Sequence, residues 1–145
     1  MTDYKIIIPA RYNSKRFPGK PLAKIHGKTM LERVWLNAME SAASEIIIAT
    51  DDQRIETAAK NFGAHVCVTS NEHKSGTERI IEAIEILGLR DDEIILNVQG
   101  DEPLLSNKLM DECASLISKK EECIGTLASP FSKGERLDDP NLVKV

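Results

Sequence analysis

A basic loop follows the first apolar run of the chain and carries the residue types that bind phosphate. Residues 11–28 contain six Lys and Arg side chains and no acidic one, although the formal net charge of the chain is −4. Gly19 lets backbone amides approach phosphate oxygens, and the prolines around it favour a single loop shape. The loop therefore predicts a polyanion site, with a solvated basic loop as the alternative. The side chains able to neutralise a triphosphate are Arg11, Lys15, Arg16 and Lys20.

An acidic turn follows a later apolar run. Residues 97–103 are Asn-Val-Gln-Gly-Asp-Glu-Pro, so Asp101 and Glu102 stand directly after that run. Mg²⁺ typically takes one or two carboxylates and lets substrate phosphates supply further ligands. A simple turn is the alternative. A basic loop and an acidic turn, each placed after a strand, together favour a site for a nucleotide and Mg²⁺.

A third polar loop, residues 70–79, closes into the start of a helix. The amides and the dipole at a helix N-terminus favour anions or polar base edges. Ser75 could serve only as a helix cap, but Gly76 and Arg79 beside it favour contact with a ligand. The turn after the second apolar run contains Thr50, for which capping a helix is the simpler interpretation.

The composition excludes several classes of protein. A chain of 145 residues with 41% hydrophobic and 29% charged residues suits one globular domain. Its mild acidity and its aromatic content of 4% argue against nucleic-acid binding. No apolar run approaches the roughly 20 residues of a membrane span. The N-terminus lacks a signal-peptide pattern, and the three cysteines lack zinc spacing, so we expect reduced cytoplasmic thiols that mostly pack in the core.

The hydrophobic pattern predicts the fold class. Four continuous apolar runs, at residues 6–8, 46–48, 66–68 and 94–96, are typical of strands buried on both faces. Helical periodicity fills the gaps between them. Strands alternating with helices predict an α/β fold with a doubly wound, mostly parallel sheet and helices on both faces. We expect residues 1–145 to form a single nucleotide-binding domain.

Helix and strand boundaries can also be predicted. The pattern Ser/Thr-x-x-Glu/Gln marks helix starts at Thr29, Thr50 and Ser75. Residues 106–119 predict a fourth helix, and residues 123–128 predict a last strand. Residues 141–145 resemble the start of a further strand, so we expect the domain to be incomplete at its C-terminus. The inward-facing residues expected on the fourth helix are Leu109, Cys113, Leu116 and Ile117.

Neither a G-x-x-x-x-G-K-[ST] nor a G-x-G-x-x-G motif occurs, which disfavours a P-loop NTPase or a nicotinamide dehydrogenase. A different set of segments runs in order through essentially the whole chain: Ile8-Pro-Ala-Arg-Tyr12, Ser14, Arg16, Pro18-Gly-Lys-Pro-Leu22, Gly27-Lys28, Ala49-Thr-Asp51, Ser75-Gly-Thr-Glu-Arg79, Asn97-Val-Gln-Gly-Asp-Glu-Pro103 and Asp139-Pro-Asn-Leu-Val-Lys-Val145. Together these segments resemble the 3-deoxy-manno-octulosonate cytidylyltransferase family, the CMP-KDO synthetases, where KDO is 3-deoxy-manno-octulosonate.

The resemblance implies a cytoplasmic transferase with a nucleotide-diphospho-sugar transferase-like, Rossmann-like fold. Such an enzyme joins CTP to an acidic eight-carbon sugar with Mg²⁺, releases pyrophosphate and supplies CMP-KDO for lipopolysaccharide. It implies that Gln99 helps to place the sugar and that Asp101 ligates the metal. The full-length family implies a homodimer that binds neither nucleic acid nor membrane. The implied nucleotide contacts are Ala10, Arg11, Arg16 and Lys20 at the phosphates and Ser75, Gly76 and Arg79 at the cytosine and ribose; Arg11, Lys20 and Asp101 are the catalytic candidates.

Two departures from the family matter. Thr29 stands where the family usually has Pro, a harmless change because Thr can cap the same helix. Members of the family are also much longer, and this chain resembles their N-terminal, nucleotide-binding half. Two alternative functions stay open. CMP-sialate synthetases also resemble the Pro-Ala-Arg and Pro-Gly-Lys segments, and the missing C-terminal half favours a non-catalytic CTP-binding domain.

Overall fold

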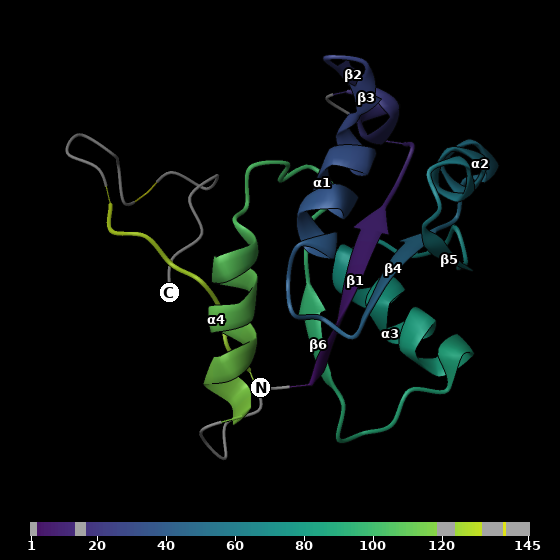
Figure 1. Ribbon diagram of the computed structural model, residues 1–145. Coiled ribbons are helices and arrows are strands. Elements are labelled where there is room, and N and C mark those ends of the chain that lie inside the picture. Colours follow the sequence, from purple (N-terminus) through teal and green to yellow (C-terminus); the bar gives the residue numbers. More distant parts are fainter. Residues whose placement is uncertain (1–2, 14–16, 119–123, 132–137, 139–145) are drawn as a thin grey trace.

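Four parallel strands form the central sheet. Strand β1 (Tyr4–Ala10) pairs with β4 (Glu45–Thr50) on one side and with β6 (Ile94–Asn97) on the other, while β5 (His65–Val68) lies beyond β4. The strand order is therefore β5-β4-β1-β6 (Figure 1). The computed structural model describes residues 3–13, 17–118, 124–131 and 138.

Helices cover both faces of this sheet, as the sequence predicts (Figure 1). Helices α1 (Met30–Met39), α2 (Gln53–Asn61) and α4 (Asn107–Ser118) share one hydrophobic core with the sheet. Helix α3 (Gly76–Leu87) packs on the opposite face. The chain thus adds β4 and β5 on one side of β1 and then crosses to the other side through α3 to form β6.

Burial on both faces explains the continuous apolar sequence of the strands. Along β1, Ile6 and Ile8 contact the core that contains α1, whereas Ile7 contacts the core beneath α3. All three side chains have no solvent exposure. Successive residues of a strand point to opposite faces, so a strand covered on both sides needs apolar residues at every position.

A small hairpin follows the basic loop. The 3₁₀ turn η1 (Lys20–Leu22) leads into β2 (Lys24–Ile25), which pairs antiparallel with β3 (Lys28–Thr29). The two-residue connection between β2 and β3 has positive φ at both positions, 47° at His26 and 83° at Gly27. Two successive left-handed residues are the signature of a type I′ hairpin turn.

Two of the three predicted helix caps are confirmed. The side-chain oxygen of Thr29 accepts a hydrogen bond from the amide of Glu32, and that of Ser75 accepts one from the amide of Glu78. The prediction for Thr50 is wrong. Thr50 is the last residue of β4, and the cap of α2 is Asp52, whose carboxylate accepts a hydrogen bond from the amide of Arg54. Thr50 is committed to the sheet because its backbone pairs with both neighbouring strands.

Helix α4 presents a different face from the predicted one. Its buried residues are Met110, Cys113 and Ala114, whereas Leu109 and Leu116 are exposed by 41% and 48%. Only Cys113 was predicted correctly among the buried positions, since Ile117 is half-buried. The helix carries two apolar stripes, and contacts with β6 and α1 select the one that faces inward.

The strand predicted over residues 123–128 is also wrong for the described part. Residues 124–128 have no strand pairing; Ile124–Leu127 instead line a cavity of about 860 Å³ together with β6 and α4. A strand requires a partner for its backbone groups, and apolar content alone supplies none. Cys123 and the predicted strand over residues 141–145 lie outside the described residues.

The described cysteines behave as core residues. Cys67 and Cys113 are buried free thiols, and burial raises the pKa of each above its usual value. In the part of the chain that the structure describes, no helix is long and apolar enough to cross a bilayer.

Tyr4 ties α4 to the sheet. Its hydroxyl donates a hydrogen bond to Asp111 Oδ1 at 2.6 Å, and the same oxygen accepts one from the Ala42 amide at 2.8 Å. Burial, followed by the contact with Asp111, raises the pKa of Tyr4 to about 12 from a usual value of 10.0.

We predict that this contact makes folding stability fall with alkaline pH. The unfolded chain loses the Tyr4 proton near its usual pKa of 10.0, whereas the folded chain retains it to about 12. The contribution is therefore complete below the unfolded value and is lost as pH rises through the folded value. Urea unfolding at several alkaline pH values should show a weaker decline for Tyr4→Phe than for the unmodified chain. Identical declines would contradict the assignment.

Candidate functional site

A cleft opens where β1 and β6 end. It has a volume of about 1050 Å³ and contains residues from the loop after β1, from the turn after β6, and Lys74. In open α/β sheets ligands bind beyond the carboxyl ends of the strands, at the point where the strand order reverses. That reversal lies between β1 and β6 here. The lining residues are Pro9, Ala10, Arg11, Asn13, Phe17, Pro18, Lys20, Pro21, Lys74, Gln99, Gly100 and Asp101.

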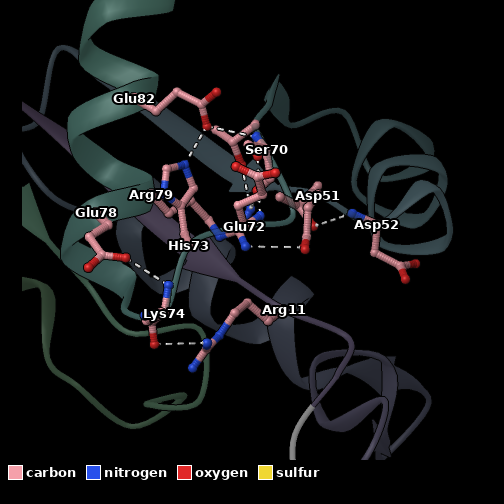
Figure 2. Close-up of polar contacts among 12 residues, drawn as sticks. Arg11, Asp51, Asp52, Ser70, Glu72, His73, Lys74, Glu78, Arg79 and Glu82 are labelled. Atoms are coloured by element: carbon pink, nitrogen blue, oxygen red, sulfur yellow. Dashed lines mark hydrogen bonds and ion pairs between the residues drawn. The ribbon is translucent and has the colours of Figure 1, made fainter.

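Among the residues that the structure describes, three cationic side chains and one carboxylate line the cleft. Lys20 Nζ donates to Asp101 Oδ2 at 2.6 Å, which joins the basic loop to the acidic turn across the cleft. Arg11 Nη1 donates to the backbone oxygen of Lys74 at 3.2 Å (Figure 2). The basic loop and the acidic turn, which the sequence predicts to form one site, therefore meet in the fold. Three cations around a hollow are suited to a polyphosphate.

Tyr12 shapes the basic loop. Gly19 has φ of 72°, and its amide donates to the Tyr12 carbonyl at 2.8 Å. A Cβ at Gly19 would lie 3.1 Å from the Tyr12 ring, so both the backbone angle and the space require glycine. The guanidinium of Arg54 lies 3.2 Å from the centre of the same ring. Helix α2 therefore supports the loop that carries Lys20 through a cation–π contact.

Two glutamates on successive turns at the start of helix α3 hold the third polar loop, residues 70–74. Glu78 accepts a hydrogen bond from the Lys74 amide at 2.7 Å. One turn later, Glu82 accepts hydrogen bonds from the Ser70 amide at 2.7 Å and contacts His73 Nε2 at 2.6 Å (Figure 2). The amide of Lys74 lowers the pKa of Glu78, and the His73 contact lowers the pKa of Glu82. These contacts fix the carbonyl of Lys74 that Arg11 uses.

Arg79 lies between those two glutamates in the sequence and is buried. Its side chain has no solvent exposure; Nη1 donates to Thr69 Oγ1 and to the Ser70 carbonyl, and Nη2 lies 3.3 Å from Asp51 Oδ1 (Figure 2). It does not line the cleft. In this structure Arg79 therefore ties the ends of β4 and β5 to α3, and its contact with a cytosine or ribose stays a prediction.

The remaining predicted residues divide between the cleft and its border. Ala10 and Gln99 line it, and Gln99 Nε2 donates to Asn97 Oδ1 at 3.0 Å. Ser75 and Gly76 lie at its border, where a Cβ on Gly76 would come within 3.2 Å of the Pro9 ring and 3.7 Å of Gln99 Oε1. The helix N-terminus thus packs directly against the strand end. Arg16, like Lys15, lies outside the described residues.

Lys74 is the cleft residue that sequence reasoning passed over. It directly precedes the Ser75 cap of α3. This position could have indicated a role in ligand binding, because a basic residue before a helix N-terminus adds positive charge to a site suited to anions. The Tyr12–Arg54 contact had no sequence signal, since it joins segments 42 residues apart by number.

A divalent cation would find one suitable ligand in the cleft. Asp101 is a half-exposed carboxylate, and its side chain is exposed by 48%. Within residues 3–13, 17–118, 124–131 and 138, no group of three or more His, Cys, Asp or Glu side chains is placed to hold a metal. A cation that takes one carboxylate and completes its shell with substrate oxygens and water, as Mg²⁺ does, fits this donor set.

The fold and the cleft define an open α/β protein with a charged cleft at the ends of its parallel strands, and comparison with known proteins gives its family. The chain belongs to the cytidylyltransferase family, whose sequence profile matches residues 5–145. It is 48% identical over 145 residues to the 3-deoxy-manno-octulosonate cytidylyltransferase of Pasteurella multocida (strain Pm70), covering all of this chain and 56% of the relative. It is 47% identical over 143 residues to the enzyme of the same name from Ruthia magnifica subsp. Calyptogena magnifica, covering 99% of this chain and 59% of the relative.

A solved structure is similar as well. A CMP:2-keto-3-deoxy-manno-octonic acid synthetase complexed with CTP superimposes with a TM-score of 0.76 at 37% identity, covering 83% of this chain and 49% of the other. The chain therefore spans little more than half the length of the curated relatives and about half of this structure.

The burial of Arg79 generates a stability prediction. Arg79→Met should lower the free energy of unfolding by about 3–5 kcal/mol, because it leaves the Asp51 carboxylate without its buried partner. The matched control is Arg90→Met, which removes an exposed guanidinium from the exposed carboxylate of Asp92. We expect a much smaller loss there, since exposed ion pairs contribute little. Urea unfolding of both variants measures the difference, and equal losses would contradict a structural role for Arg79.

Proposed function

We propose that the chain is the nucleotide-binding part of a 3-deoxy-manno-octulosonate cytidylyltransferase. The reaction transfers CMP from CTP to KDO, giving CMP-KDO and pyrophosphate for lipopolysaccharide synthesis. The observation that carries the proposal is the cleft at the β1–β6 reversal, where Arg11, Lys20 and Lys74 lie around the carboxylate of Asp101. The family membership and the identity of 48% to the Pasteurella multocida enzyme support the choice of substrates.

The proposed chemistry is an in-line displacement. The anomeric hydroxyl oxygen of KDO forms a bond to the α-phosphorus of CTP, and the bond from that phosphorus to the β-phosphate oxygen breaks. The hydroxyl proton passes to water, and pyrophosphate leaves with the bonding electron pair. The protein has little covalent work in such a reaction, so positioning and charge stabilisation provide the catalysis.

Each cleft residue has a proposed task. Arg11, Lys20 and Lys74 hold the triphosphate and stabilise the departing pyrophosphate. The helix N-terminus at Ser75 and Gly76 faces the nucleotide, and Gln99 orients the sugar. When bound, Mg²⁺ supplies positive charge to the phosphate oxygens, and Asp101 is the residue that would hold it. A cytoplasmic location and a homodimer follow from the family resemblance and stay predictions.

The first test compares nucleotides and sugars. Calorimetric titration of the chain should give tighter binding of CTP than of ATP, GTP or UTP. With Mg²⁺ present, pyrophosphate release by the chain and by a full-length relative should then be measured with KDO and with a sialic acid. CTP preference with KDO turnover supports the proposal. Turnover with the sialic acid alone assigns a CMP-sialate synthetase. CTP binding without turnover by the chain alone is the result expected for the nucleotide-binding part of an enzyme, whereas absence of turnover in a full-length version as well assigns a non-catalytic CTP-binding domain.

We predict that Arg11→Ala and Lys20→Ala weaken CTP far more than cytidine. Both side chains belong to the basic loop and line the cleft. Each charge-assisted hydrogen bond to a phosphate is worth about 1.5–3 kcal/mol. Titrations of CTP and cytidine into each variant measure the two losses. Equal losses for both ligands would move these residues away from the phosphates.

We predict that Asp101→Asn nearly abolishes Mg²⁺-dependent turnover in a full-length version. Loss of one preorganised charge contact at a reacting centre typically lowers the rate on the order of 10²-fold or more. The control is Glu102→Gln, which changes the neighbouring carboxylate outside the cleft lining. Pyrophosphate release by Asp101→Asn at the rate of the unmodified enzyme would remove Asp101 from the metal site.

A further inference from the structure

Lys20 and Asp101 are bonded to each other across the cleft, although the proposed function gives each of them a different ligand. The distance between Lys20 Nζ and Asp101 Oδ2 is 2.6 Å. Lys20 begins η1 directly after Gly19, and Asp101 stands in the turn after β6, so the contact spans 81 positions of sequence. The side chains are exposed by 37% and 48%, so both can exchange this contact for a contact with a ligand.

The bonded arrangement differs from the one that the reaction needs. A carboxylate that accepts from an ammonium group at 2.6 Å has its charge balanced and binds a divalent cation less well. An ammonium group that donates to a carboxylate likewise attracts phosphate less strongly. Arg11 is in a different position, because it donates to the backbone oxygen of Lys74, which carries no formal charge.

We propose that the Lys20–Asp101 ion pair is a latch that couples the binding of the nucleotide to the binding of the metal. The inference rests on the proposed function. In the free protein the latch is closed. A phosphate that draws Lys20 away leaves Asp101 to a cation, and a cation on Asp101 leaves Lys20 to a phosphate. Each ligand thereby raises the affinity for the other through the protein, in addition to their direct attraction.

The size of this coupling is set by the strength of the ion pair. Pairs as exposed as this one change an equilibrium by about two- to fivefold. Because coupling between two binding equilibria is reciprocal, the same factor applies to the nucleotide and to the metal. The ion pair therefore changes both affinities only modestly. While it is closed, Arg11 and Lys74 are the cations that meet the phosphates.

The test uses CTP without metal, so that direct attraction between Mg²⁺ and phosphate does not contribute. CTP is titrated in EDTA into the unmodified chain, Lys20→Ala, Asp101→Asn and the double variant. Asp101→Asn should tighten CTP binding by about two- to fivefold, because Lys20 is then released to the phosphates. In the Lys20→Ala background the same change should have a distinctly smaller effect. The control Glu102→Gln removes an adjacent carboxylate and measures the general gain from lost negative charge.

The second arm measures Mn²⁺ binding without nucleotide by paramagnetic resonance. Lys20→Ala should weaken CTP yet tighten Mn²⁺, and it should tighten Mn²⁺ more than Lys74→Ala, which removes a cleft cation that is not bonded to Asp101. Equal effects of Asp101→Asn with and without Lys20, or equal effects of the two lysine variants on Mn²⁺, would overturn the latch. Failure of the unmodified chain to bind CTP would instead overturn the proposed function, and the Mn²⁺ arm would still decide whether Lys20 competes for Asp101.

Discussion

Strand β1 hydrogen-bonds to β4 along one edge and to β6 along the other, and all three strands run in the same direction. The chain builds outward from β1 on the β4 side and returns on the β6 side, so the loops after β1 and β6 diverge from a shared edge. This reversal creates the hollow. The cations of one loop and the carboxylate of the other meet there because parallel pairing carries both strand ends to the same edge of the sheet.

The polar contacts of α3 extend this arrangement to a third loop. Glu78 and Glu82 hold backbone amides of residues 70–74, while buried Arg79 joins that loop to Asp51 at the end of β4 (Figure 2). Side chains of α3 thus hold the loop in place, and Lys74 at its end lines the cleft. A rigid support of this kind favours catalysis by positioning, since it removes the need to order the loop when substrate binds. Arg79 thus contributes to the site through the loop that it holds.

The fold class and most of the strand positions could be predicted from the sequence, because burial on both faces leaves a continuous apolar pattern in β1, β4, β5 and β6. The cleft residues Arg11, Lys20 and Asp101 could be predicted because they belong to the charged segments that follow β1 and β6. The inward face of α4 could not, since Leu109 and Met110 are equally apolar and tertiary contacts decide between them. The burial of Arg79 beside Asp51 could not be predicted either, because charge alone does not indicate whether a side chain is exposed or lies in a buried ion pair.

The central claim is that CTP occupies the cleft between the β1 and β6 loops. The most direct measurement is a titration of the ¹⁵N-labelled chain with CTP, followed by amide chemical shifts. The account predicts that the largest changes fall on the cleft amides of Ala10, Lys74 and Gly100. Amides around the cavity between β6 and α4, such as Leu96 and Ala114, should change little. The largest changes around that second cavity, with none at the β1 loop, would contradict the account.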